Sequence, residues 1–156
     1  MSNILKLFAS VIVSQAAGLI GAVFTRNSVT TWYANLNKPS FAPPNWLFGP
    51  VWTLLYLLMG IAVFLVWKQG LKTPYVKVAL VVFVFQLVLN TLWSIIFFNL
   101  RSPGVAFIEI IALWLSIAVN IYLFAKVSET AAWLLVPYIL WVSFAGLLNY
   151  YIYALN

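Results

Sequence analysis

Three segments of this sequence carry aromatic and amide side chains at helical spacing, and these side chains have the clearest capacity to bind a ligand. The sets are Phe48, Trp52, Tyr56 and Met59; Gln86, Asn90, Trp93 and Phe97; and Tyr138, Trp141, Ala145 and Leu148, with Asn149 beside the third. Steps of three or four residues place each set on one face of a helix. Flat aromatic faces suit a flat conjugated ligand, and a few amides among them can orient it. The alternative interpretation is that the aromatic rings form core and the amides join helices.

The residue types that are missing exclude most other chemistry. The sequence contains no Cys and no His, and its two acidic residues are Glu109 and Glu129. A thiolate nucleophile, an imidazole base, a zinc site of Cys or His ligands and an imidazole-ligated haem are therefore excluded. A carboxylate dyad is not expected, because Glu129 is predicted in a loop and Glu109 near the start of an apolar helix, close to headgroup water. We expect no metal site and no required cofactor.

The apolar composition determines the fold class. Of the 156 residues, 65% are hydrophobic and 6% are charged, whereas soluble domains carry about 25% charged residues. Crossing a bilayer takes about 20 apolar residues, and five stretches meet that requirement. The sequence predicts an all-α integral membrane protein with one domain over residues 1–156 and helices at about 4–25, 46–67, 76–100, 104–125 and 131–153. We expect Pro137 to kink the fifth helix.

The basic residues and the first helix bear on topology. The net charge of +6 is assigned to membrane anchoring rather than to nucleic acid, and its distribution favours an N-terminus in the cytoplasm. Ser14, Gly18 and Ala22 recur every fourth residue, which favours close helix packing, either within a protomer or across a dimer. The segment Ser14-Gln15-Ala16 resembles a signal-peptide cleavage site, but the apolar stretch continues to Phe24 and therefore predicts a retained helix.

The connection over residues 25–45 is rich in proline and aromatic residues. It contains Trp32, Tyr33 and Phe41 together with Pro39, Pro43 and Pro44. Proline fixes the backbone and removes amide donors. The loop is therefore expected to act either as an interfacial anchor or as a lid over a cavity.

These motifs together resemble a known family. The matching residues are Trp32-Tyr33, Lys38-Pro39, Phe41, Pro43-Pro44, Trp46, Gly49-Pro50, Val51-Trp52, Leu55-Tyr56, Met59-Gly60, Gln86, Leu89-Asn90, Trp93, Phe97-Phe98, Pro137-Tyr138, Trp141, Ala145 and Leu148-Asn149-Tyr150. They are similar to the signature of the translocator protein family, also called tryptophan-rich sensory proteins or peripheral benzodiazepine receptors. The resemblance covers nearly the whole chain.

The resemblance implies a homodimer of five-helix protomers in a bacterial cell membrane. It further implies binding of porphyrins such as protoporphyrin IX, and of isoquinoline carboxamide or benzodiazepine-type drugs, in a pocket under the first loop. That pocket would use Tyr33, Pro43, Pro44, Trp46, Phe48, Trp52, Asn90, Trp93, Trp141, Ala145 and Leu148, to which the stripes add Tyr56 and Tyr138. A propionate of the porphyrin could pair with Lys38 or Arg26.

The implied role is tetrapyrrole transport, sensing or turnover. One alternative is an enzyme-like function, in which Trp52 and Trp141 are catalytic in oxidative or light-driven breakdown of protoporphyrin. A second alternative is a regulatory protein that signals ligand binding to a partner. Animal members carry a cholesterol motif in which a basic residue follows a tyrosine. The residues after Tyr150 include no Lys or Arg, so we do not expect cholesterol binding through that motif.

Overall fold

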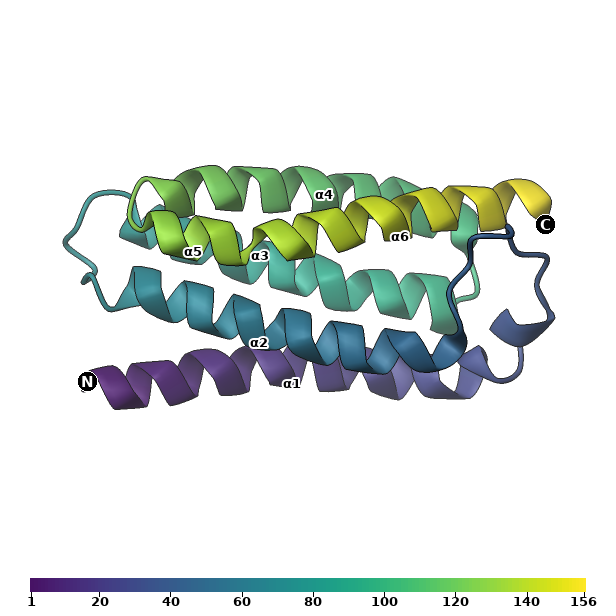
Figure 1. The fold of residues 1–156 in the computed structure, drawn as a ribbon, viewed down its shortest axis with the longest axis horizontal. Helices are drawn as coiled ribbons and strands as arrows, with labels where there is room; N and C mark the ends of the chain where they lie inside the picture. Colours follow the sequence, from purple (N-terminus) through teal and green to yellow (C-terminus); the bar gives the residue numbers. More distant parts are fainter.

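The computed structural model describes all 156 residues, and every regular element in it is helical. The elements are α1 (Asn3–Val29), the 3₁₀ turns η1 (Tyr33–Asn35) and η2 (Asn45–Leu47), α2 (Phe48–Trp67), α3 (Val76–Ser94), the π-helical turn η3 (Ile95–Asn99), α4 (Pro103–Ala125), α5 (Glu129–Leu134) and α6 (Val136–Leu155). Five helical stretches are long and apolar enough to cross a membrane. They lie side by side with the termini at opposite ends (Figure 1). The predicted five-helix membrane bundle is confirmed.

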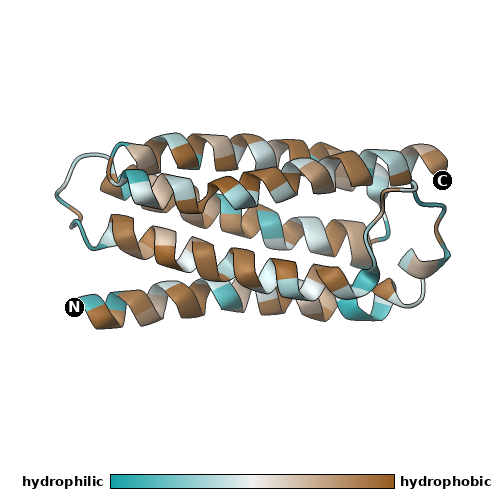
Figure 2. Ribbon diagram, in the orientation of Figure 1, coloured by the Kyte–Doolittle hydropathy of each residue, from teal (hydrophilic) through white to brown (hydrophobic).

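Most residues along the helices are hydrophobic, and the segments that connect the helices at the two ends of the bundle are more hydrophilic (Figure 2). A transmembrane bundle faces lipid on its outside, so its outward side chains stay apolar. Ile108 and Val81 are accordingly among the most exposed large hydrophobic residues, at 71% and 68%.

Helix α1 extends beyond the predicted end near residue 25. The polar run that follows Phe24 suggested a loop, but the helix continues to Val29. Within the added turn, Ser28 is buried and its hydroxyl donates a hydrogen bond to the carbonyl oxygen of Phe98 at 2.7 Å. A tertiary contact with the π-helical turn therefore stabilises residues whose local sequence favours a loop.

The fifth span is broken at Leu135, which separates α5 from α6. Pro137 has no backbone N–H to continue the helical ladder, so the predicted kink is confirmed. The placement of Glu129 in a loop was wrong, because α5 begins at Glu129. The hydroxyl of Ser128 caps this helix by accepting from the amide of Ala131 at 3.2 Å, and an acidic residue is favourable in the first turn.

Small residues bring α1 and α2 into close contact near the N-terminus of α1. A Cβ on Gly60 would lie 2.8 Å from Cα of Val11, and a Cβ on Gly18 would lie 2.6 Å from the ring of Tyr56. Ser14 is completely buried, whereas Ala22 is exposed. Ser14 and Gly18 of the small-residue stripe therefore pack within the protomer.

Candidate functional site: an aromatic cavity

A cavity of about 200 Å³ lies between α1, α2, α6 and the C-terminal part of the third span. Helix α1 contributes Gln15, Gly18, Leu19, Gly21, Ala22 and Thr25, and α2 contributes Phe48, Gly49, Trp52, Thr53 and Tyr56. The third span (Val76–Asn99), which comprises α3 and η3, contributes Trp93, Ser94, Phe97 and Phe98. Helix α6 contributes Trp141, Ala145, Leu148, Asn149 and Ile152, and the first loop contributes Tyr33. Most of this lining is aromatic or aliphatic, with few polar groups. That composition is typical of small-molecule pockets between helices.

Trp52 is the centre of the aromatic wall. Its ring centroid lies 5.7 Å from that of Tyr56, 6.4 Å from that of Tyr138 and 6.5 Å from that of Trp141. Phe48 lies next to this group, 6.2 Å from Trp141 and 6.1 Å from the loop residue Tyr33. Most of these contacts are edge-to-face, the arrangement that aromatic pairs prefer. Two helices and the loop thus hold six aromatic side chains in defined orientations.

A buried hydrogen-bonded cluster supports the wall from behind. Tyr56 donates to Oδ1 of Asn90 at 2.8 Å, and Asn90 Nδ2 donates to the hydroxyl of Tyr138 at 2.6 Å. Tyr138 in turn donates to Oε1 of Gln86 at 2.6 Å, and Gln86 Nε2 contacts the sulfur of Met59 at 3.9 Å. All five side chains are at most 5% exposed. The two amides therefore join α2, α3 and α6, and neither of them lines the cavity.

The third span adds a second connected group. Trp93 stacks on Phe97 at 5.1 Å, and its indole N–H donates to Oδ1 of Asn149 at 3.0 Å. The amide nitrogen of Asn149 donates to the carbonyl of Pro103 at 2.8 Å. Trp93 and Asn149 thereby hold α3, α4 and α6 together at the cavity wall, and the hydrogen-bonding capacity of Trp93 is already used.

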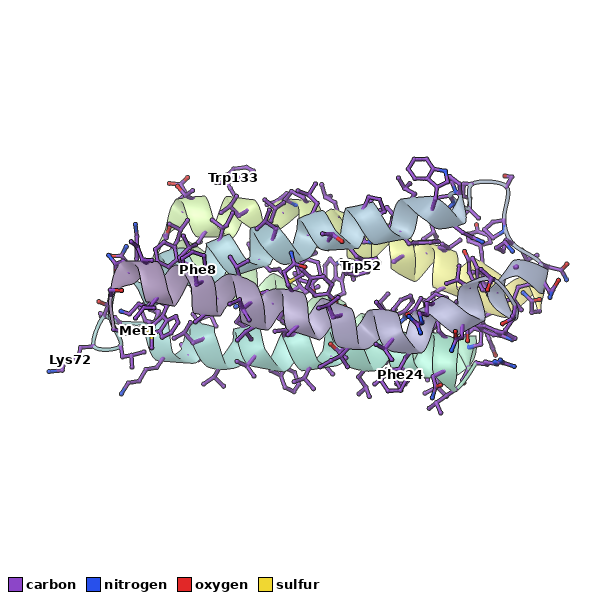
Figure 3. All side chains as sticks on the ribbon, turned by 90° about the horizontal axis from the view of Figure 1, so that it is seen from below. Met1, Phe8, Phe24, Trp52, Lys72 and Trp133 are labelled. Carbon is purple, nitrogen blue, oxygen red and sulfur yellow. The ribbon has the colours of Figure 1, made fainter.

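The mouth of the cavity lies between α1 and α2. The exposed members of its lining are Leu19 and Ala22 on α1 and Gly49 and Thr53 on α2. Figure 3 shows these two helices diverging beyond Trp52, toward the end where the first loop lies. Because both helices are lipid-facing spans, a hydrophobic ligand can reach this opening from within the bilayer.

The first loop crosses the end of the bundle from α1 to the C-terminal end of α6 (Figure 1). The amide of Asn37 donates to Oδ1 of Asn156 at 3.1 Å, and Asn156 Nδ2 donates to the carbonyl of Asn37 at 2.9 Å. Phe41 packs against Phe144 and Tyr151, at 6.0 and 5.4 Å. The middle of the loop is thus held against α6, and Tyr33 at its start lies in the cavity wall.

The structure gathers eight of the predicted site residues around one cavity: Tyr33, Phe48, Trp52, Tyr56, Trp93, Trp141, Ala145 and Leu148. It places five others outside the lining: Pro43, Pro44, Trp46, Asn90 and Tyr138. Trp46 is 70% exposed, which suits an interfacial anchor. Sequence reasoning missed the lining residues of α1. The small-residue stripe was the available signal, because small side chains also leave room for a ligand.

Two charged groups lie in environments that differ from those expected. The Lys38 ammonium is 2.9 Å from the carbonyl oxygen of Tyr33 and 3.3 Å from those of Ala34 and Leu36. It is therefore satisfied by the loop backbone rather than free for a propionate, and Arg26 does not line the cavity.

The carboxyl oxygens of Glu109 are buried without a hydrogen-bond partner. The sequence placed Glu109 close to headgroup water, whereas its two carboxyl oxygens are enclosed by protein atoms.

Comparison with known proteins gives matches along nearly the whole chain. The family described as TspO/MBR matches residues 10–155. Tryptophan-rich protein TspO of Archaeoglobus fulgidus is 48% identical over 155 residues, which cover 99% of this chain and 99% of that protein. Tryptophan-rich protein TspO of Chlorobaculum tepidum is 44% identical over 154 residues, 99% and 98% of the two chains. Translocator protein of Homo sapiens is 39% identical over 138 residues, 88% and 82% of the two chains. The matched range contains every residue of the cavity lining.

Proposed function

The chain belongs to the TspO/MBR family, and we propose that it binds porphyrins and other flat aromatic ligands in the cavity around Trp52. Its five apolar spans and its bacterial relatives identify it as an integral bacterial membrane protein. The single observation that carries the proposal is the wall of aromatic rings around Trp52 and Trp141, open to the bilayer between α1 and α2. Isoquinoline carboxamide and benzodiazepine-type drugs share the flat apolar rings that such a wall accepts.

Stacking rather than metal coordination carries this binding. The sequence has no His and no Cys, which are the usual axial ligands of haem iron. Rings at the wall offer both faces and edges to a conjugated macrocycle, and aromatic pairs contribute about 0.5–1.5 kcal/mol beyond area burial. The ligand is therefore a tetrapyrrole recognised by its ring, with or without a metal at its centre.

Binding of a tetrapyrrole requires the cavity to expand. Its volume of about 200 Å³ is below the roughly 300–1,000 Å³ of typical ligand pockets. The divergence of α1 and α2 leaves an opening through which part of a large ring can project toward lipid. The first loop supplies the other route to expansion, because two asparagines and one aromatic group hold it on α6. We expect loop displacement to accompany ligand binding.

The experiment is a titration with protoporphyrin IX in detergent, followed by quenching of tryptophan fluorescence. Trp52→Phe and Trp141→Phe each replace an indole of the wall with a smaller phenyl ring that lacks the N–H, and Trp133→Phe is the matched control because Trp133 is 66% exposed on α5. We expect both wall variants to weaken binding by about fivefold or more, which corresponds to about 1 kcal/mol. Equal affinity of the wall variants and the control would refute the proposed site.

A second candidate function is light-driven or oxidative breakdown of the bound porphyrin. The observation that favours it is the edge contact of two oxidisable rings, Trp52 and Trp141, in one cavity wall. Loss of porphyrin absorbance under light is compared between the double Trp→Phe variant and Trp133→Phe at equal occupancy. Equal rates of absorbance loss in the two variants would show that these tryptophans take no part in porphyrin breakdown and that the protein only binds the ligand. The homodimer, and signalling to a partner, stay predictions of the family resemblance.

A further inference from the structure

Contacts between aromatic rings continue from the cavity wall to the surface of the bundle. The ring centroids of Trp52 and Trp141 lie 6.5 Å apart, and that of Trp141 lies 5.4 Å from that of Phe144, which does not line the cavity. Phe144 lies 6.0 Å from Phe41 of the first loop, and Phe41 lies 5.4 Å from Tyr151. A continuous series of rings therefore joins the cavity to the C-terminal part of α6.

The series ends at two exposed tyrosines. Tyr151 is 41% exposed and lies 5.7 Å from Tyr150, which is 46% exposed. Both belong to the last two turns of α6, at the end of the bundle that the first loop crosses (Figure 1). A tyrosine at a membrane interface keeps its ring among apolar groups and its hydroxyl in water. Water is therefore available to accept a proton from either phenol.

This connection distinguishes the two tyrosines from the other exposed oxidisable side chains. Of the exposed tyrosines and tryptophans, only Tyr150 and Tyr151 are paired with another ring. Tyr153 is 57% exposed near the same end of α6 and has no aromatic partner. A position near the end of α6 is therefore not sufficient to connect a tyrosine to the cavity.

The surroundings of Trp141 favour passing an oxidising equivalent onward. In a chain without Cys, indole and phenol side chains lose a single electron most readily. The indole nitrogen of Trp141 is buried without a hydrogen-bond partner, so no neighbouring protein group can take its proton after the ring is oxidised. The oxidised indole therefore keeps its charge and draws an electron from another side chain.

The buried phenols next to Trp52 cannot supply that electron easily. A phenol that loses an electron must also lose its proton. The hydroxyls of Tyr56 and Tyr138 donate to the amide oxygens of Asn90 and Gln86, and a neutral amide is too weak a base to take the proton. Only the two exposed tyrosines combine a connection to the wall with access to water.

We propose that this series of rings carries single oxidising equivalents from the cavity to Tyr151 and Tyr150 at the membrane surface. The inference rests on the proposed function, since the oxidant is a bound porphyrin that has lost one electron to dioxygen under light, giving superoxide. Trp141 replaces the lost electron, and Tyr151 then reduces Trp141. The O–H bond of Tyr151 breaks, its proton goes to interfacial water, and a neutral phenoxyl radical remains.

The net change is one electron transferred from a surface phenol to dioxygen and one proton released to water. The porphyrin and the wall tryptophans are left intact, so this path competes with their oxidative breakdown. A water-soluble reductant such as ascorbate restores the phenol by giving the radical a hydrogen atom. Tyr150, in contact with Tyr151, shares the radical site.

The test is electron paramagnetic resonance of the protein with bound protoporphyrin IX, frozen after illumination in the presence of dioxygen. A variant with both Tyr150→Phe and Tyr151→Phe keeps the two rings and removes the phenols. Tyr153→Phe is the matched control, because it lies on the same helix without an aromatic partner. Trp141→Phe removes the indole of the path, and all proteins are compared at equal porphyrin occupancy. Oxidation of the wall tryptophans is measured by peptide mass spectrometry.

We expect wild type and Tyr153→Phe to give the same tyrosyl radical signal, and the double tyrosine variant and Trp141→Phe to lose most of it. In the double tyrosine variant, oxidation of Trp52 and Trp141 should increase, because the oxidising equivalent stays in the wall. If porphyrin binds and either the double variant or Trp141→Phe keeps the full tyrosyl signal, the inference is overturned while the proposed function stands.

A second measurement tests the path without porphyrin. Ultraviolet light that tryptophan absorbs and tyrosine does not ejects an electron from tryptophan, and dioxygen takes it up. The tyrosyl signal is then compared in the same four proteins. If protoporphyrin IX does not bind but this signal falls in Trp141→Phe and in the double tyrosine variant, the proposed function fails while the inference stands. If porphyrin does not bind and the signal is the same in all four proteins, both fail.

Discussion

The polar cluster behind the cavity makes the substitution Tyr138→Phe a sharp test of the fold. The hydroxyl of Tyr138 accepts from Asn90 and donates to Gln86, each at 2.6 Å, and all three side chains are at most 1% exposed. Phenylalanine keeps the ring and removes both bonds. Oε1 of Gln86 and Nδ2 of Asn90 would then be buried without these partners, in a region that no lipid or water reaches.

Two estimates bracket the cost. Interhelical side-chain hydrogen bonds in membranes average about 0.6 kcal/mol, which gives about 1.2 kcal/mol for two bonds. A buried group left without a partner costs about 1–3 kcal/mol. The second value applies here, because the bonds have no alternative partner in the cluster. With two groups left without a partner, we therefore expect a loss of about 2–6 kcal/mol in the free energy of unfolding.

The assay is reversible unfolding by SDS in mixed micelles, followed by far-ultraviolet circular dichroism. Tyr56→Phe removes one bond of the same cluster and leaves Oδ1 of Asn90 without that donor, so it should cost about 1–3 kcal/mol. Tyr122→Phe is the exposed control and should change stability by less than about 0.5 kcal/mol. If Tyr138→Phe matched the control, or cost less than Tyr56→Phe, the cluster would not stabilise the bundle as described.

Three further predictions concern α1, the loop and pH. Gly60→Ala places a Cβ 2.8 Å from the backbone of Val11, so it should lower the free energy of unfolding in SDS by about 1–3 kcal/mol. Gly49→Ala is the control, because a Cβ there has no atom within 4 Å, and it should leave that free energy unchanged. Asn156→Ala removes two hydrogen bonds to the first loop and should speed porphyrin dissociation in stopped-flow fluorescence; an unchanged rate would show that the loop does not retain the ligand. Burial raises the pKa of Tyr33 from 10.0 to about 12. Its contribution to the free energy of unfolding is therefore complete below pH 10 and is lost as pH rises toward 12. In unfolding measured as a function of pH, Tyr33→Phe should lose less stability than wild type between pH 10 and 12.

The sequence alone was sufficient for the number and approximate bounds of the spans. Apolar length and helical period are local properties, and the bilayer converts them directly into transmembrane helices because a backbone in lipid must bond internally. Pro137 likewise breaks its helix through its own missing N–H. The aromatic stripes with Trp52 and Trp141 were recognisable for the same reason, since spacing fixes which residues share a helix face.

Only the tertiary structure decided what each face meets. Asn90 and Tyr138 share the stripes of the cavity residues, yet they bond to each other behind the wall. Lys38 turns back onto its own loop, and the polar end of α1 stays helical because Ser28 finds a carbonyl of the third span. These outcomes depend on which groups the packed helices bring within hydrogen-bond distance, and local spacing carries no information about such partners.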